Sequence, residues 1–237
     1  MSHGHRVPLV YRGFRFFGAP FRFHVAGLEN IQGSGPAIYT ANHLGSLGPI
    51  QAILSVPVRF YPWVVAEMMD PARAPRYLYD DFIVPELHLD GRAGIAVATA
   101  ISWVSVRMLR GAGAIAMDSN RGRIIDGFRR SLELLAEGQN VLIFPENDQG
   151  QVDAGTGLYP FKPGFAELCT IHQRASRKRV PIYPMAVHAG ARQIAIDSPM
   201  FVEDGKGRRQ DVERACAELR QRTLSLYHQL DAPSRSV

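Results

Sequence analysis

Short apolar segments alternate along this chain with amphipathic segments of helical period. Residues 37–41 and 141–144 are apolar runs of strand length, and residues 120–138 place apolar side chains on one face of a helix. Another strand is expected over residues 180–187, and a long amphipathic helix follows it. Strands that alternate with helices pack as an α/β domain, because each crossover helix covers the sheet and returns the chain in parallel. We therefore predict an α/β fold with a mixed, largely parallel sheet flanked by helices.

The first twenty residues differ in character from the rest of the chain. Residues 7–20 mix phenylalanine and tyrosine with arginine, a combination typical of a helix that lies on an anionic membrane surface. An ordinary amphipathic helix packed on the domain is the alternative. We predict an N-terminal membrane-associating segment over residues 1–20 and one domain over residues 21–237.

Two stretches without charged residues could be considered as membrane spans. Residues 33–58 are interrupted by glycine, proline and the pair Asn42-His43, so their backbone could not satisfy its hydrogen bonds in lipid. Residues 93–106 are uncharged but shorter than the roughly 20 residues that a crossing needs. We expect a buried helix there, and a peripheral rather than an integral membrane protein.

The charge and the reactive side chains limit the function further. The net charge of +5 suggests an anionic partner, either a lipid surface or a nucleic acid. The basic runs at residues 174–179 and 206–209 lack stacking aromatics and any recognised motif, so we do not expect a nucleic acid. Cys169 and Cys216 are expected to be reduced thiols of a cytoplasmic protein. No Gly-x-Ser-x-Gly elbow and no metal-ligand spacing occur, so neither a serine hydrolase nor a metal site is predicted.

Four short segments carry the chemistry and occur in a fixed order. They are Gly27–Ile31 leading through Gly35-Pro36 to Asn42-His43, then Phe144-Pro145-Glu146-Asn147, then Pro160–Ala166, and last Val180–Val187. His43 and Glu146 each follow the end of a predicted parallel strand, where ligands bind in α/β sheets. In this order the segments resemble the PlsC-like family, the glycerol-3-phosphate and lysophosphatidic-acid acyltransferases. The resemblance covers roughly residues 25–196.

The resemblance implies an O-acyltransferase. Its fatty acyl group would come from acyl-CoA or acyl carrier protein and pass to a hydroxyl of a lysolipid or another lipid acceptor. It also implies that His43 is the general base, and an imidazole pKa of about 6.5 suits that role near neutrality. Glu146 is implied to help bind the acceptor, so the expected catalytic pair is His43 and Glu146. The thioester is already activated, so neither a nucleophilic side chain nor a cofactor beyond the acyl donor is expected.

Four further residues are expected to bind substrate. Lys162 lies in the family's Lys-x-Gly segment, where its ammonium can meet a phosphate as a point charge. Arg121 lies two positions beyond the place of the arginine in the family's Asp-Arg pair. Asn42 and Asn147 adjoin the catalytic pair. The alternative for these positions is structural: a turn histidine at residue 43, a loop carboxylate at Glu146 and a surface lysine at Lys162.

The chain departs from the family pattern after His43. The family motif is Asn-His, four residues and then Asp, and the position of that Asp is here Gly48. The missing carboxylate would orient the imidazole, and loss of the comparable acid in a serine-protease triad lowers turnover about 10⁴-fold. Candidates to replace it are Glu67, Asp80, Asp81 and Asp148.

The chain departs again after Glu146. The family reads Gly-Thr-Arg-Ser there, whereas this chain has Asn147-Asp148-Gln149-Gly150. The arginine that meets acceptor phosphate is thus replaced by Gln149, and Asp148 would repel a phosphate. We therefore hypothesise an acceptor without phosphate at this position, such as a sugar, an amino-lipid or another hydroxylated lipid.

The resemblance leaves one alternative of a different class. Gly48 favours a non-catalytic lipid- or acyl-binding protein on the same scaffold. Either function places the protein on the membrane, and we predict a peripheral location on its cytoplasmic face, with the lipid surface, a lipid acceptor and the acyl donor as partners.

Overall fold

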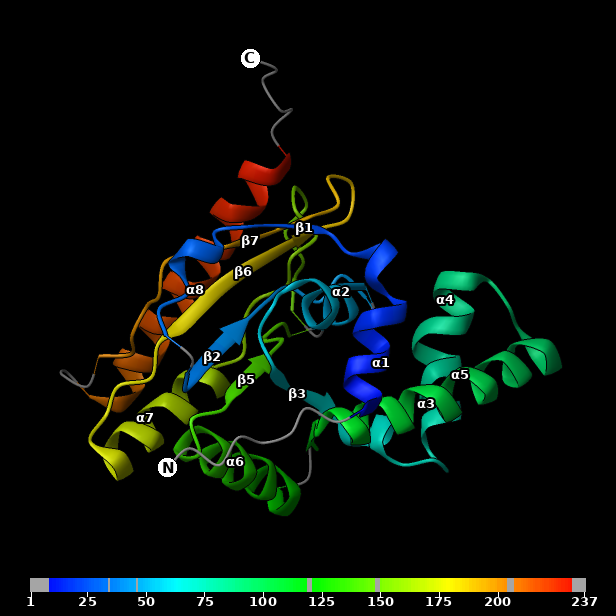
Figure 1. Ribbon diagram of the computed structural model, residues 1–237, viewed down its shortest axis with the longest axis horizontal. Helices are drawn as coiled ribbons and strands as arrows, with labels where there is room; N and C mark the ends of the chain where they lie inside the picture. The colour runs from blue at the N-terminus through cyan, green and yellow to red at the C-terminus, as the bar shows by residue number, and fades with distance from the viewer. Residues whose placement is uncertain are drawn as a thin grey trace. The chain divides into compact units, whose positions relative to one another are not determined.

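The computed structural model describes residues 9–33, 35–45, 47–118, 121–147, 150–203 and 207–231 of the 237-residue chain. The chain forms two compact units. The larger unit comprises residues 21–60 and 131–237, and the smaller unit comprises residues 1–20 and 61–130. Strands and helices alternate in both units (Figure 1), so the predicted α/β class is confirmed.

The larger unit contains five strands in the spatial order β1-β7-β6-β2-β5. Their bounds are β1 His24–Ala26, β2 Ala37–Thr40, β5 Asn140–Ile143, β6 Ile182–His188 and β7 Gln193–Ile196. β2 pairs in parallel with β5 on one side and β6 on the other, and only β6–β7 is antiparallel among these pairs. β2, β5 and β6 are buried throughout, as expected for central parallel strands covered on both faces. The three strands predicted here are therefore confirmed, whereas β7 was not predicted.

Stacked aromatic rings fill the core beneath β2. The ring of Tyr39 stacks on that of Tyr183 at 4.9 Å and meets the edge of Phe60 at 5.0 Å. Burial raises the pKa of Tyr39 above its ordinary value, and the nearby Tyr183 raises it further. The hydroxyl of Tyr183 accepts a hydrogen bond from the backbone of Gln32 at 2.9 Å. These contacts fix β2, which leads directly to Asn42 and His43.

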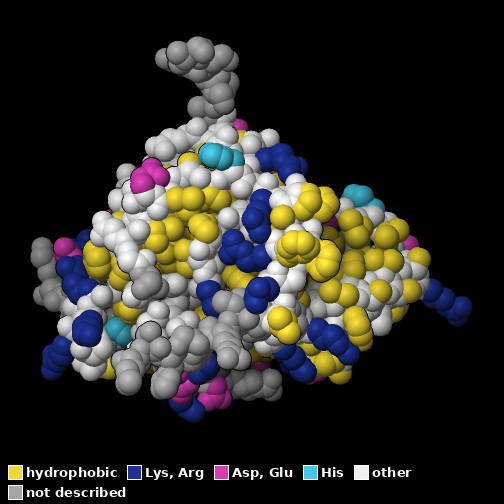
Figure 2. Space-filling model, in the orientation of Figure 1, with side chains coloured by type: hydrophobic (Ala, Val, Ile, Leu, Met, Phe, Trp, Pro, Cys, Tyr) yellow, Lys and Arg dark blue, Asp and Glu magenta, His cyan; other side chains and the backbone are white. Residues whose placement is uncertain are grey.

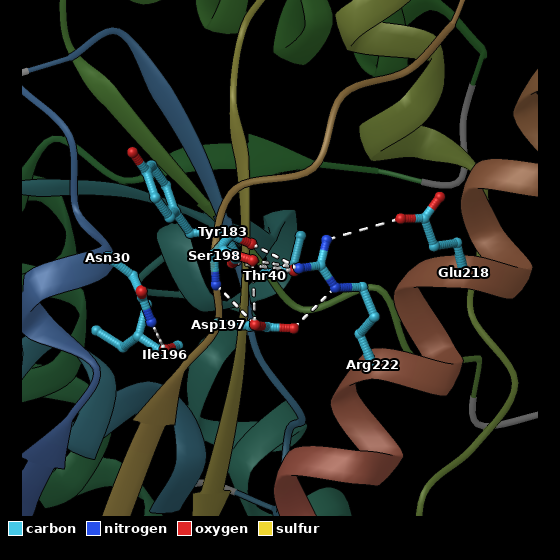
Figure 3. A network of polar contacts seen from close by, with 8 residues as sticks. All are labelled: Asn30, Thr40, Tyr183, Ile196, Asp197, Ser198, Glu218 and Arg222. Carbon is cyan, nitrogen blue, oxygen red and sulfur yellow. Dashed lines mark hydrogen bonds and ion pairs between the residues drawn. The ribbon is translucent and has the colours of Figure 1, made fainter.

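The helices of the larger unit include α2 Leu47–Ser55, α7 Gly164–Ser176 and α8 Arg208–Asp231, with a 3-10 turn, η2, at Leu28–Asn30. α8 packs against β6 and β7 along a buried stripe that comprises Val212, Ala215, Leu219 and Leu226. Arg222 fastens this helix to the segment after β7 (Figure 3), because its guanidinium donates to the Asp197 carboxylate at 2.7 Å and to the Ser198 carbonyl at 2.9 Å. The predicted closing helix is confirmed.

The smaller unit is mainly helical. Its elements are α1 Leu9–Phe17, β3 Phe60–Val65, η3 Ala66–Met69, α3 Ala74–Leu78, η4 Tyr79–Ile83, α4 Val84–Leu87, α5 Gly91–Ala112 and β4 Ile115–Met117; Phe60 itself is counted in the larger unit. β3 and β4 pair in parallel. α5 packs against α1 and α3, around a core of Leu78, Ile83 and Ala98. The N-terminal helix thus belongs to this unit, and its predicted role on a membrane stays a prediction.

α5 corrects one expectation. Residues 93–106 were predicted to form a buried helix, but the helix runs over Gly91–Ala112 and only one stripe of it is buried. Trp103 is 60% exposed, and Ile95 and Val104 are also exposed. By length and composition alone, this helix would be able to cross a membrane. The prediction failed because the buried stripe is built from small residues, such as Gly94 and Ala98, while larger side chains face outward.

α6 Arg121–Ala136 begins in the smaller unit and ends in the larger one. The helix was predicted, but its apolar side chains do not all face the core. Ile125 is 58% exposed, whereas Leu134 is fully buried. The cause lies at Gly127, where a Cβ atom would come within 2.4 Å of the Met117 sulfur. The helix therefore approaches β4 through a glycine instead of through its isoleucines.

Candidate active site

His43 lies at the carboxyl end of β2, in the larger unit. Ala41 and Asn42 are buried, but the His43 side chain is exposed and its ring meets the edge of Phe144 at 5.4 Å. Phe144 directly follows β5, the parallel neighbour of β2. The carboxyl ends of two adjacent parallel strands thus bring the His43 and Glu146 segments together, at the place where α/β sheets bind ligands.

Glu146 holds the backbone on which His43 sits. One carboxylate oxygen accepts the backbone N–H of His43, and the other accepts the backbone N–H of Tyr159 at 3.0 Å. A carboxylate that accepts from two amides is a charge-assisted bridge, stronger than a neutral hydrogen bond. Glu146 therefore ties the turn after β2 to the loop before α7.

The second and third sequence segments form a short antiparallel pair. Glu146 and Phe161 form a bridge, the Asn147 N–H donates to the Pro160 carbonyl at 2.7 Å, and the Lys162 N–H donates to the Pro145 carbonyl at 2.6 Å. The side chain of Lys162 is exposed and that of Asn147 is half-buried. The structure thus brings Asn147 and Lys162 to the neighbourhood of Glu146, and their substrate-binding role stays a prediction.

Asn42 joins the first and fourth segments. Its side chain is fully buried, its carbonyl oxygen accepts the Val187 N–H at 2.7 Å, and its amide donates to the Val187 carbonyl at 3.0 Å. The side-chain amide thus links the segment after β2 to β6 and fixes the chain immediately before His43. This geometry favours a positioning role, and the substrate-binding role expected for Asn42 stays a prediction.

Gly48 closes the turn that contains His43. Its N–H donates to the His43 carbonyl at 3.0 Å, and Leu44 and Gly45 both have positive φ, 43° and 58°. A Cβ atom at position 48 would lie 2.2 Å from the His43 carbonyl oxygen and 2.5 Å from that of Asn42. The turn therefore requires glycine at the position where the family has its aspartate.

The other predicted residues lie in different places. Glu67 is ion-paired with Arg73, and Asp80 is ion-paired with Arg76 at 2.6 Å. Both carboxylates, together with Asp81, line a surface pocket of the smaller unit. Arg121 is the first residue of α6, and its side chain lies outside the described part of the chain. Asp148 and Gln149 also lie outside the described residues. A carboxylate that orients His43 stays a prediction.

Both thiols are held in the protonated form. Burial raises the pKa of Cys169 to about 12. Burial, with smaller contributions from Glu167 and Glu213, raises the pKa of Cys216 to about 11. Among the described residues, no group of three or more His, Cys, Asp or Glu side chains is placed to hold a metal ion.

The sequence did not reveal two backbone partners of the site. Tyr159 and Val187 act through N–H and C=O groups that every non-proline residue carries, so their side chains give no signal. The sequence hints were that Tyr159 directly precedes the third segment and that Val187 is the last residue of the fourth.

Three comparisons with known proteins bear on this arrangement. The Acyltransferase family model matches residues 81–188, a range that includes Glu146 and Lys162 but begins after His43. The fold is similar to the crystal structure of the 1-acyl-sn-glycerophosphate (LPA) acyltransferase PlsC from Thermotoga maritima, with a TM-score of 0.57 and 15% sequence identity over 95% of this chain and 81% of that chain. No curated protein matches the sequence.

The family match supports an acyltransferase, and the fold is similar to that of PlsC. More particularly, they support assignment of the chain to the PlsC-like family. The resemblance inferred from the four sequence segments is thereby confirmed.

Proposed function

We propose that this protein transfers a fatty acyl group from acyl-CoA or acyl carrier protein to a hydroxyl of a lysolipid or another lipid acceptor, with His43 as the general base. The observation that carries the proposal is the exposed imidazole of His43, at the carboxyl end of β2, on a turn held by Glu146 within a PlsC-like fold.

The chemistry needs one base and no covalent intermediate. The neutral imidazole of His43 takes the proton from the acceptor hydroxyl as its oxygen attacks the thioester carbonyl carbon. A C–O bond forms and the C–S bond breaks, so the products are the ester and a thiolate. The imidazolium then returns its proton to the thiolate, which leaves as the free thiol. Histidine suits both steps because its pKa lies close to neutrality.

Glu146 acts through His43 in this proposal. Both of its oxygens accept backbone N–H groups, so the carboxylate sets the position of the His43 turn and places a negative charge near it. Lys162 is the residue we assign to a phosphate of the acyl donor or acceptor, because its side chain is exposed beside Phe161, the bridge partner of Glu146. Asn147 and Arg121 are proposed to complete the substrate-binding set.

The acceptor is proposed to lack a phosphate beside Glu146. The support is the sequence alone: Gln149 stands where the family has arginine, and Asp148 adds a negative charge. An acceptor that carries a sugar, an amino-lipid or another hydroxylated lipid fits these substitutions better than lysophosphatidic acid. We propose that the reaction takes place at the cytoplasmic face of a membrane, which supplies the acceptor.

The test is acceptor-dependent release of free thiol from long-chain acyl-CoA, or from acyl carrier protein, with a panel of phosphorylated and neutral lysolipids. We expect turnover with at least one acceptor and a loss of about 10³-fold or more in His43→Ala and His43→Gln, a size typical of a lost general base. His228→Gln is the matched control, because His228 is an exposed histidine on α8. Absence of acceptor-dependent release from the whole panel would contradict the proposal.

A second candidate function is favoured by one observation, the glycine at position 48. A non-catalytic acyl- or lipid-binding protein would bind acyl-CoA equally well with and without His43. Calorimetric titration of the wild type and His43→Ala with a non-hydrolysable acyl-CoA thioether separates the two. Equal binding, together with no turnover in either protein, would support the binding protein.

A further inference from the structure

One face of α5 carries apolar side chains into solvent. Its exposed residues recur at helical spacing, and five of the seven are apolar. They are Ile95, Ala96, Thr99, Ala100, Trp103, Val104 and Arg107, which we call the α5 stripe. The largest of them, Trp103, is 60% exposed, and Val104 and Ile95 are 56% and 52% exposed. Such an exposed apolar face marks a docking surface.

The polar residues of the α5 stripe turn their groups toward the helix. The hydroxyl of Thr99 donates to the Ile95 carbonyl at 2.8 Å. The guanidinium of Arg107 lies 3.7 Å from the centre of the Trp103 ring and donates to the Trp103 carbonyl at 3.2 Å. The hydroxyl is therefore already satisfied within the helix, and the arginine lies flat on an aromatic ring. Both arrangements suit contact with an apolar medium that has an anionic rim.

α1 extends the same kind of surface. It packs against α5, and Leu9, Phe16 and Phe17 are each at least 74% exposed. Neither helix contains an aspartate or a glutamate, while the two together carry five arginines: Arg12, Arg15, Arg92, Arg107 and Arg110. On the face shown in Figure 2, hydrophobic side chains gather over the region of α1 and α4. The surface is thus apolar and positively charged at once.

We infer that the α5 stripe, with the exposed apolar residues of α1, docks the smaller unit onto an anionic lipid bilayer, with α5 lying in the plane of the interface. The inference deepens the membrane location proposed above. It differs from the sequence prediction, which assigned membrane contact to residues 1–20 alone and placed residues 93–106 in the core. α5 lies on the bilayer and does not cross it, because its other face is buried through Gly94, Ala98 and Ser102 within the smaller unit.

The charge pattern favours lipid over an acidic protein. Residues 93–106 carry no charge, so the arginines lie at the ends of α5, with Arg107 at the end of the α5 stripe and none at its centre. A bilayer surface matches this pattern, because the apolar side chains can enter the acyl region while the arginines at both ends meet anionic headgroups. An acidic protein would be recognised by cations within its footprint, where their charges are desolvated.

Tryptophan fluorescence tests the inference directly, since the chain has two tryptophans. Trp63→Phe leaves Trp103 as the reporter, and Trp103→Phe leaves Trp63, which packs on Phe128. With vesicles of phosphatidylcholine and phosphatidylglycerol, we expect Trp103 emission to shift to shorter wavelength and to be quenched by brominated acyl chains. Vesicles of phosphatidylcholine alone should bind more weakly, and the Trp63 reporter should not respond.

A matched pair of variants separates this surface from general hydrophobicity. Val104→Asp lies in the α5 stripe, and Val152→Asp adds the same charge at a valine of similar exposure in the larger unit, 42%. We expect Val104→Asp to weaken vesicle co-sedimentation about tenfold or more, because an apolar side chain leaves the bilayer and a charge would enter it. Val152→Asp should bind like the wild type, and thermal unfolding should show that both variants fold.

Other outcomes would overturn the inference. The inference is wrong if the emission wavelength of Trp103 does not change when vesicles are added. It is also wrong if that wavelength changes only when the protein concentration rises, or only when an acidic carrier protein is added. Acyl transfer between short-chain substrates dissolved in water should be the same in Val104→Asp as in the wild type. That assay separates failure of membrane docking from failure of the proposed enzymatic function.

Discussion

The carboxylate of Glu146 accepts the backbone N–H of His43, and with its second oxygen it accepts the backbone N–H of Tyr159. The residue that the family resemblance assigns to the acceptor therefore also holds the turn that contains His43. Asn42 holds the same turn from the opposite side, through Val187 on β6. His43 thus gains a fixed backbone from two neighbours, although the aspartate of the family motif is absent.

Glu146→Gln should lower turnover more than it affects substrate binding. A glutamine offers one carbonyl oxygen, so one of the two backbone N–H groups loses its acceptor, and the bridge loses its charge. Hydrogen bonds to charged groups contribute about 1.5–3 kcal/mol, which corresponds to a loss of about 10- to 100-fold in kcat. Steady-state kinetics for donor and acceptor would measure this, with Glu29→Gln, an exposed glutamate on η2, as the control. A higher KM for the acceptor with unchanged kcat would instead show that Glu146 contacts the acceptor.

The same variant has a signature that does not depend on activity. The amide proton of His43 should resonate far downfield in the wild type, because its acceptor is a carboxylate, and should move upfield in Glu146→Gln. Two-dimensional NMR of labelled protein checks this. An unchanged His43 amide would contradict the positioning role.

Asn42→Ala should destabilise the larger unit. It leaves the N–H and the C=O of Val187 buried without partners, and each unsatisfied group costs about 1–3 kcal/mol. Asn30→Ala is the comparison, because the half-buried Asn30 amide donates to one backbone group, the Ile196 carbonyl, at 2.8 Å (Figure 3). Urea unfolding should show a free-energy loss of about 2–4 kcal/mol for Asn42→Ala and about half of it for Asn30→Ala. Equal losses would mean that the second hydrogen bond between Asn42 and Val187 contributes no additional stability.

Restoring the family aspartate should not restore a family active site. In both Gly48→Asp and Gly48→Ala, the Cβ atom would overlap the carbonyl oxygens of His43 and Asn42, so the turn must open. We expect each variant to lose about 1–3 kcal/mol of stability and most of its turnover, to a similar extent. Gly155→Ala is the control, since a Cβ atom there meets only Asp153 at an ordinary 3.6 Å. Higher turnover in Gly48→Asp than in Gly48→Ala would contradict this view.

The two cysteines should react slowly in the folded protein. With pKa values of about 12 and about 11, Cys169 and Cys216 form very little thiolate at pH 8. Alkylation by iodoacetamide, followed by mass spectrometry, should be slow for both residues under native conditions and fast in denaturant. Rapid native labelling that abolishes acyl transfer would point to a thiol in the active site.

His172 should make the protein less stable in mild acid. Its side chain is buried on α7, and burial lowers its pKa below the ordinary value. The unfolded chain, with a pKa of about 6.5, therefore takes up a proton before the folded protein does. The stability contribution of neutral His172 is complete above that pH and declines as the pH falls from about 6.5 toward the lower folded pKa. Denaturant unfolding at several pH values should show this decline, and His172→Gln should reduce it.

The sequence predicted the frame of the larger unit well. The uniform apolar runs at β2, β5 and β6 are typical of strands buried on both faces, and the residues that follow two of these strands are those of the candidate site. These strands could be predicted because burial on both faces of a sheet requires a continuous run of apolar residues. Periodicity was less informative for α5 and α6, where small residues approach their neighbours and large ones face out.

The sequence by itself determined the α/β class, the four ordered segments and the identity of His43 and Glu146 as neighbours across parallel strand ends. Only the tertiary structure decided what Glu146, Asn42 and Gly48 do there. Glu146 accepts backbone N–H groups of His43 and Tyr159, Asn42 binds the backbone of Val187, and Gly48 leaves room for the carbonyl groups of the His43 turn. Backbone amides and carbonyls are the same in every residue type, so their pairing leaves no mark on a sequence until the chain is folded.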